Sequence, residues 1–203
     1  MKHRPIGALH VSVVGVGCNN FGARLDQAQT DAVVHAALDA GITYFDTAES
    51  YGDGQSEVLL GKALGARRSD VVIASKWGHT AFLGEDEHGG EPAQIRKRLE
   101  GSLRRLGTDH IDHYQLHTPD PVTPHEDTLG CLTELRAEGK IREIGCTQFS
   151  ASQIVAAQGA ADRRAVHAYA SVQNRYSLLS RGPETDGVLD ACDRLGMAFV
   201  PFF

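Results

Sequence analysis

Short apolar runs rich in β-branched residues alternate with longer segments of helical pattern along the whole chain of 203 residues. The runs start about 30 residues apart, which is the length of one βαβ step. Each connection is long enough for a crossover helix, so we expect the strands to pair in parallel. We predict strands over Val11–Gly17, Thr43–Thr47, Val71–Lys76, Ile111–His117, Ile141–Thr147, Ala168–Gln173 and Met197–Phe203.

The segments between these runs carry the signals of helix starts and stops. An apolar stripe at helical spacing begins at Ala28, and Gly41 follows it as a left-handed stop. Thr123, Pro124 and Glu126 form a capping box with proline at the first helical position. Further glycines that we expect to end helices stand at positions 65, 107, 139 and 196. No linker or low-complexity segment divides the chain, so residues 1–203 are predicted to form one domain.

The charge balance argues against a nucleic-acid surface. The formal net charge is -6, whereas such a surface needs an excess of lysine and arginine. Basic residues do gather at positions 96–98, 104 and 105, but they fall in one predicted helix, where we interpret them as its solvated face. We therefore expect no nucleic-acid partner.

The cysteines and the terminal segment indicate a cytoplasmic protein. Cys18, Cys131, Cys146 and Cys192 form no C-x-x-C pair, which argues against a zinc site or a redox motif and fits reduced thiols. The first residues hold no apolar signal segment, and no stretch reaches the length of a membrane span. The sequence predicts a soluble protein without a membrane partner.

Four polar residues stand at the downstream ends of three successive predicted strands. Asp46 and Tyr51 follow the second strand, Lys76 ends the third, and His117 ends the fourth. Tyrosine can give a proton to a carbonyl oxygen, lysine can stabilise the phenolate that remains, aspartate can hold the lysine, and histidine can orient the carbonyl. In a closed barrel all strand ends face one mouth, whereas an open sheet gathers a site only at its switch point. This set therefore favours a barrel and carbonyl reduction.

A metal site and a Rossmann nucleotide site are the rival interpretations. His110, His113 and His117 share one segment, but on a strand His113 and His117 stand about 13 Å apart at ~3.3 Å per residue, too far to share one ion, and His110 points to the opposite face. Gly15 and Gly17 begin a G-x-G-x-x-G pattern after the first strand, but Asn20 replaces its third glycine. We predict neither a bound metal nor a Rossmann domain.

A series of motifs resembles one known family. The series is GITYFDTAESYG (41–52), GQSEVLLG (54–61), SKW (75–77), IDHYQLH (111–117), GKIREIG (139–145) and QNRY (173–176). In this order and spacing the motifs resemble the aldo-keto reductase superfamily over essentially the whole chain. The resemblance implies an α/β fold, a (β/α)8 TIM barrel that binds NADPH across its mouth without a Rossmann domain.

The resemblance also implies roles for individual residues. It indicates an NADP-dependent oxidoreductase that reduces the carbonyl of a small-molecule aldehyde or ketone to an alcohol. Tyr51 would be the general acid, and Lys76 would lower its pKa. Asp46 would pair with Lys76, and His117 would orient the carbonyl.

Contacts to the cofactor and to the substrate follow from the same resemblance. Thr147 and Gln148 stand where the family commonly has Ser-Asn, and Gln148 is one methylene longer than that asparagine. The substrate contacts would be Asn19 and Trp77, and NADH remains open as an alternative cofactor. The complete set of implied cofactor contacts is Gly17, Cys18, Asp46, Thr147, Gln148, Gln173 and Phe202.

The length of the chain bears on these expectations. A (β/α)8 barrel needs about 250 residues, and this sequence ends within the seventh predicted strand, at Phe203. We therefore expect a truncated barrel that lacks its last units, with impaired cofactor binding and activity. We also expect self-association through the unpaired edges of the first and seventh strands. The alternative is a reductase-like regulatory or binding subunit without significant turnover.

Overall fold

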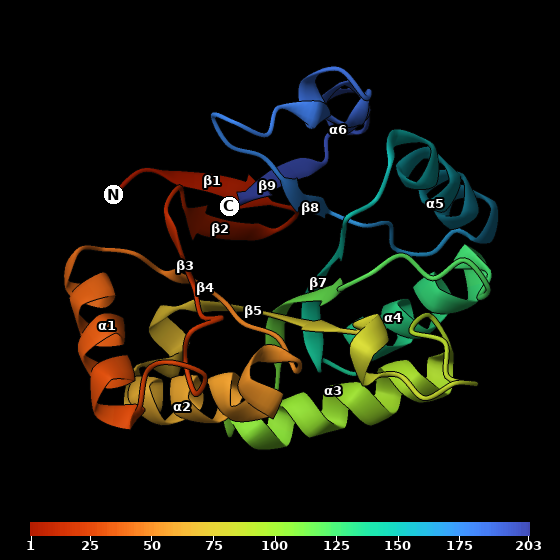
Figure 1. Cartoon of the computed structure of the whole chain (residues 1–203). Helices are drawn as coiled ribbons and strands as arrows, with labels where there is room; N and C mark the ends of the chain where they lie inside the picture. Colours follow the sequence, from red (N-terminus) through yellow and green to blue (C-terminus); the bar gives the residue numbers. More distant parts are fainter.

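The computed structural model describes residues 1–203 and shows an α/β fold built on a curled sheet of parallel strands (Figure 1). One edge of β3 and one edge of β9 pair with no other strand, so the sheet is a curled half-barrel of the predicted (β/α) type. The seven strands lie in chain order: β3 (Gly15–Gly17), β4 (Tyr44–Asp46), β5 (Val72–Trp77), β6 (Ile111–Leu116), β7 (Ile141–Thr147), β8 (Ser171–Arg175) and β9 (Ala198–Phe202).

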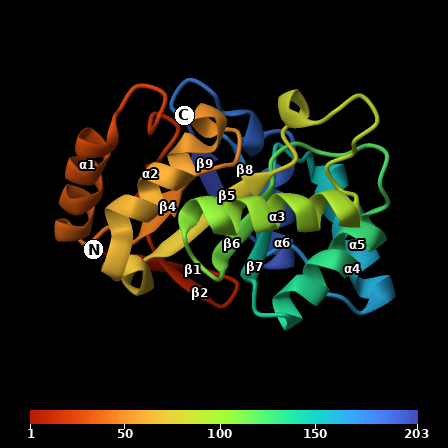
Figure 2. The same cartoon turned by 90° about the horizontal axis from the view of Figure 1, so that it is seen from below.

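Helices connect successive strands and pack side by side along the outside of the sheet, as the view from below shows (Figure 2). None of them is long and apolar enough to cross a membrane. The helices are α1 (Gln27–Asp39), α2 (Gln55–Leu64), α3 (Pro92–Leu106), α4 (His125–Ala137), α5 (Ala151–Arg164) and α6 (Val188–Leu195). Short 3₁₀ turns are η1 (Tyr51–Gly54), η2 (Gly65–Asp70), η3 (Thr80–Phe82) and η4 (Gly182–Glu184).

The two faces of the sheet differ because side chains alternate along each strand. Outward side chains such as Phe45, Ile73 and Tyr114 are completely buried against the helices and form the main apolar core. Burial of each such side chain contributes about 1.5–3 kcal/mol. Polar side chains take the inward positions near the carboxyl ends of the strands, and they are Asp46, Lys76, Gln115, Thr147 and Gln173.

The amino-terminal residues form a hairpin that the sequence analysis missed. The predicted strand Val11–Gly17 is wrong: β1 (His3–Ile6) and β2 (Leu9–Ser12) pair antiparallel, and only β3 joins the parallel sheet. Gly7 turns the hairpin with φ of +54°, and a Cβ there would lie 2.6 Å from Cδ of Glu143. The hairpin packs its apolar face on the strand starts, where it meets Tyr44 and Ala74.

Two predictions about the helices are also corrected. Helix α4 has no capping box: Pro124 precedes its first residue, and the Thr123 hydroxyl donates to Asp120 instead, at 2.7 Å. The basic cluster on α3 is not wholly solvated, because Arg105 donates to the fully buried Glu57 at 2.6 Å. The predicted glycine stops are confirmed, with positive φ at positions 41, 65, 107, 139 and 196.

Candidate active site

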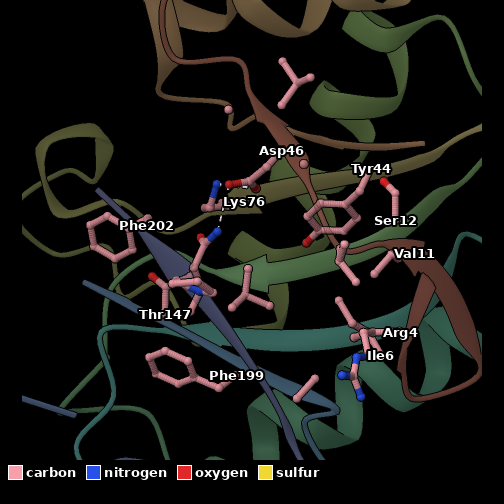
Figure 3. Close-up of a pocket in the computed structure, with 18 of the residues that line it drawn as sticks. Arg4, Ile6, Val11, Ser12, Tyr44, Asp46, Lys76, Thr147, Phe199 and Phe202 are labelled. Atoms are coloured by element: carbon pink, nitrogen blue, oxygen red, sulfur yellow. Dashed lines mark hydrogen bonds and ion pairs between the residues drawn. The ribbon is translucent and has the colours of Figure 1, made fainter. Parts of the chain in front are cut away.

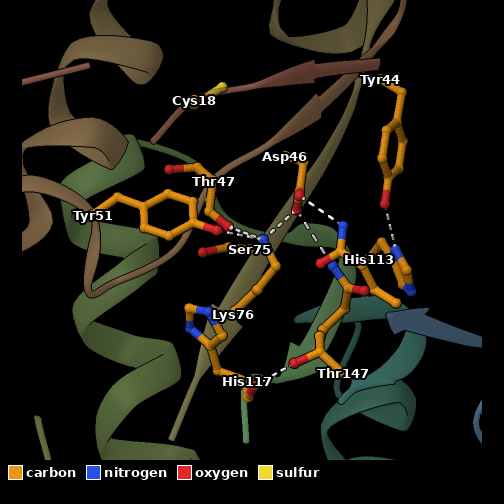
Figure 4. Close-up of polar contacts among 12 residues, drawn as sticks. Cys18, Tyr44, Asp46, Thr47, Tyr51, Ser75, Lys76, His113, His117 and Thr147 are labelled. Atoms are coloured by element: carbon orange, nitrogen blue, oxygen red, sulfur yellow. Dashed lines mark hydrogen bonds and ion pairs between the residues drawn. The ribbon is translucent and has the colours of Figure 1, made fainter. Parts of the chain in front are cut away.

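The carboxyl ends of β4, β5 and β6 bring the four predicted polar residues together (Figure 4). Asp46 is the last residue of β4, Lys76 lies one residue before the end of β5, and His117 follows β6 directly. Tyr51 begins the η1 turn after β4. Because these strands are parallel neighbours, their ends lie at the same edge of the sheet.

Lys76 lies at the centre of this group and is almost completely buried. Its Nζ donates to Asp46 Oδ1 at 2.6 Å, to the carbonyl oxygen of Thr47 at 3.1 Å and to the Tyr51 hydroxyl at 3.3 Å. Burial on its own lowers the pKa of Lys76, but attraction by Asp46 and Tyr51 outweighs burial and raises it above the ordinary lysine value. The side chain is therefore a charged ammonium beside the phenol.

Asp46 also accepts hydrogen bonds from side chains of strands β6 and β8. Gln173 on β8 donates its Nε2 to Asp46 Oδ2 at 2.8 Å, and Gln115 on β6 lies 3.5 Å from Oδ1. These two amides and Lys76 give the carboxylate three hydrogen-bond donors. The pair with Lys76 is thus fixed in position by strands β4, β5, β6 and β8.

His117 is a neutral imidazole next to Tyr51. Its pKa is lowered to about 3, first by burial and then by the positive charge of Lys76 and by His79. The ring stands edge-on to the Tyr51 ring at 5.8 Å between centroids. Its backbone oxygen accepts hydrogen bonds from the side chains of Thr147 and Gln148, so β7 and the residue after it hold the end of β6.

A cavity of about 900 Å³ opens beside these residues and runs down the open side of the sheet. Ligand pockets in proteins have volumes of about 300–1,000 Å³. Figure 3 shows Asp46, Lys76 and Phe202 towards one end of the cavity, and Arg4 and Ile6 of the hairpin towards the other. Ten of the residues predicted for the site line this cavity: Gly17, Asn19, Asp46, Tyr51, Lys76, His117, Thr147, Gln148, Gln173 and Phe202.

Comparison with known protein families agrees with this geometry. The model of the aldo/keto reductase family matches residues 13–203, which is nearly the whole chain. The chain belongs to the aldo/keto reductase family. Membership indicates an oxidoreductase that acts on small-molecule carbonyl compounds with a nicotinamide cofactor.

Two residues predicted for the site of this aldo/keto reductase do not line the cavity. The Trp77 ring is fully buried, stacks on Tyr114 at 4.4 Å and donates Nε1 to the Gly89 carbonyl oxygen at 2.8 Å. It faces the helices because Lys76, its neighbour on β5, faces inward. Cys18 is also fully buried, and burial raises the pKa of its thiol. Its carbonyl oxygen accepts a hydrogen bond from the Ser56 hydroxyl at 2.8 Å.

The sequence analysis missed several residues near this reductase site. Gln115 contacts Asp46, while Ser50 and His79 contact the His117 ring, at 3.4 Å from Oγ to Nδ1 and 4.8 Å between ring centroids. Inward alternation from His113 would have placed Gln115 on the inner face. The hairpin residue Arg4 lines the far end of the cavity. The two residues between Ile6 and Leu9, which include Gly7, were the sequence signal for this hairpin.

The cavity wall of the reductase suits a nicotinamide ring with its carboxamide. Gln173 and Gln148 use their amide nitrogens on Asp46 and on the His117 carbonyl oxygen, and no protein group donates to either side-chain oxygen. These two acceptors match the two N–H donors of a carboxamide. Phe199 and Phe202 line the same cavity with aromatic rings. The donor and acceptor set therefore fits the cofactor that the family uses.

Proposed function

We propose that this chain is an NADPH-dependent reductase that converts an aldehyde or ketone carbonyl to an alcohol. The observation that carries the proposal is the buried Lys76 ammonium, which lies between the Asp46 carboxylate and the Tyr51 hydroxyl. A buried ammonium with one carboxylate partner and one phenol partner is suited to proton donation by the phenol. The reductase chemistry of the family agrees with that role.

Tyr51 is the proposed general acid. Its hydroxyl donates a proton to the substrate oxygen, and the phenolate that remains lies 3.3 Å from the Lys76 ammonium. Two opposite charges ~4 Å apart attract by about 4 kcal/mol at an effective dielectric constant of about 20. That amount is worth about three powers of ten in rate. Asp46 keeps Lys76 charged and in place, so it supports the same step.

His117 is the proposed orienting group. As a neutral ring at the cavity wall it can hold the carbonyl oxygen near Tyr51 without competing as an acid. Thr147, Gln148, Gln173 and Phe202 would hold the nicotinamide, with Gly17 at the facing strand end. The bound cofactor supplies the hydride. The residues of the chain supply the proton, the orientation of the carbonyl and the exclusion of water.

Purified protein mixed with NADPH and an aromatic aldehyde tests the proposal. We expect loss of NADPH absorbance with the wild type and at least a hundredfold slower loss with Tyr51→Phe, because general acid catalysis contributes about 10²–10⁴-fold. Tyr176→Phe is the matched control, since that hydroxyl bonds only the surface residue Glu184. A parallel series with NADH compares the two cofactors.

Binding is measured separately by cofactor fluorescence. Tyr51→Phe should bind NADPH as the wild type does, since the proposal gives Tyr51 no part in holding the cofactor. Binding of NADPH without turnover of any aldehyde or ketone would reject the reductase and favour a binding subunit. Equal rates for Tyr51→Phe and Tyr176→Phe would reject Tyr51 as the acid.

A further inference from the structure

The Ser50 hydroxyl is the starting point, because it has one partner only. Ser50 precedes the η1 turn, a position where serine usually accepts a hydrogen bond from the following backbone. Here the side chain makes no such bond. Its only hydrogen-bond partner is Nδ1 of His117, at 3.4 Å. Bonds in catalytic sites are often long before the substrate binds.

The partner nitrogen decides how His117 can act. Because the pKa of His117 is lowered to about 3, chiefly by burial, the ring carries one N–H at neutral pH. A neutral imidazole donates from one nitrogen and accepts at the other, and the bond at one nitrogen fixes the role of the other. No protein group bonds Nε2, so this nitrogen alone remains for a substrate at the cavity wall.

We propose that Ser50 is a positioning residue that donates its hydroxyl proton to His117 Nδ1 and thereby fixes the tautomer with hydrogen on Nε2. The inference rests on the proposed reductase function and assigns the substrate-facing group: an N–H that donates to the carbonyl oxygen. The hydroxyl has no other hydrogen-bond partner in the structure, so this nitrogen is the one protein acceptor within its reach. The opposite tautomer would turn a lone pair towards the carbonyl oxygen and repel it.

Two neighbouring aromatic rings restrict the rotation of the His117 ring. The His79 ring stands edge-on at 4.8 Å between centroids, and the Tyr51 ring does so at 5.8 Å. His79 is itself oriented, because its Nδ1 accepts from the backbone N–H of Ala81 at 3.2 Å. These contacts restrict rotation but leave the tautomer open. Ser50 is the one protein group that bonds a ring nitrogen of His117.

Nitrogen NMR of protein labelled with ¹⁵N-histidine reads the tautomer directly, without any enzymatic activity. His117→Gln assigns the signals by their loss. We expect the wild type to show a protonated Nε2 and an unprotonated Nδ1 at neutral pH. Ser50→Ala should move the two shifts towards each other, as in exchanging tautomers, and Ser50→Thr should restore the wild-type pattern because it keeps a hydroxyl. Ser69→Ala, at an exposed residue, is the matched control.

The outcome separates this inference from the proposed function. A protonated Nδ1 in the wild type, or a Ser50→Ala spectrum identical to the wild type, overturns the inference whether or not the protein reduces carbonyls. If the protein is a reductase, Ser50→Ala should lower kcat/KM for the aldehyde about fivefold, because that is the rate factor that corresponds to the net contribution of one neutral hydrogen bond. Ser50→Thr should recover that loss, and the Kd for NADPH should stay unchanged in both variants.

Discussion

Asp46→Asn removes the negative partner of a buried lysine, and its effect on stability can be worked out from the ion pair. The Lys76 side chain is 2% exposed and the Asp46 side chain 15%, with 2.6 Å between Nζ and Oδ1. Removing one member of a buried pair costs about 3–5 kcal/mol, because the other charge is left without compensation. We therefore expect the free energy of unfolding at pH 7 to fall by about that amount.

The pH dependence of this variant should have the opposite sign to that of the wild type. In the wild type the folded pKa of Lys76 is raised, so its contribution is complete below the unfolded value and is lost as pH rises through the folded pKa. In Asp46→Asn burial dominates and places the folded pKa below the unfolded one. The unfolded chain then binds more protons between these two values. Stability of the variant should therefore rise with pH towards about 10.

Urea unfolding followed by circular dichroism between pH 7 and 10 measures both effects. Asp86→Asn, at an exposed residue, is the control and should match the wild type. The double variant Asp46→Asn/Lys76→Met leaves no buried charge at this pair and should recover more than half of the loss. A loss below about 1 kcal/mol, or a stability that does not rise with pH, would refute the reasoning that the lysine is charged because of Asp46.

Three further predictions concern the interior of the sheet and its edges. Gly145→Ala should destabilise the fold by about 1–3 kcal/mol in urea unfolding, because the new Cβ would lie 2.5 Å from Ser171 Oγ and 2.6 Å from His113 Nε2. Gly130→Ala in α4, where a Cβ meets nothing within 4 Å, should stabilise it by about 0.5–1 kcal/mol, and the reverse order would contradict the packing argument. Glu143→Gln should lose stability at pH 7, and this loss should shrink as pH falls from about 4 through the folded pKa, because bonds from His167 and Ala8 outweigh burial and lower the pKa of Glu143. A loss that does not shrink with falling pH in thermal unfolding would be inconsistent with this. The free edges of β3 and β9 should favour self-association, seen as a sedimentation coefficient that rises with protein concentration, and a constant value would exclude it.

Local periodicity predicted the parallel strands and the residues at their ends. The inward position of Lys76 follows from the same alternation that turns Trp77 outward, so the sequence already placed Trp77 away from the cavity. The first strand was wrong for another reason. Apolar residues at positions 11, 13, 14 and 16 form an almost unbroken run, which hid the break between β2 and β3. There Val13 and Val14 are about half exposed.

Contacts between distant segments could not be read from local patterns. Thr123 looked like a helix cap, but the Asp120 carboxylate takes its hydroxyl and also binds the Gly90 N–H at 2.7 Å, thirty residues away. The local sequence of Arg105 predicted a solvated side chain, but Arg105 forms an ion pair with the buried Glu57 of another helix. In the site, the bond from Gln173 to Asp46 joins residues 127 positions apart. Such pairings depend on how the sheet curls, which no window of sequence contains.

The bond between Gln173 and Asp46 means that the two halves of the site share one carboxylate. The proposed acid comes from the η1 turn after β4 and its lysine from β5, whereas the proposed carboxamide acceptors come from the residue after β7 and from β8. Asp46 accepts from both halves, one on each oxygen. A substitution at Gln173 would remove a hydrogen bond from the carboxylate that pairs with Lys76. On the proposed function, a substitution that alters the cofactor contact at Gln173 would therefore also affect proton transfer through the pair of Asp46 and Lys76.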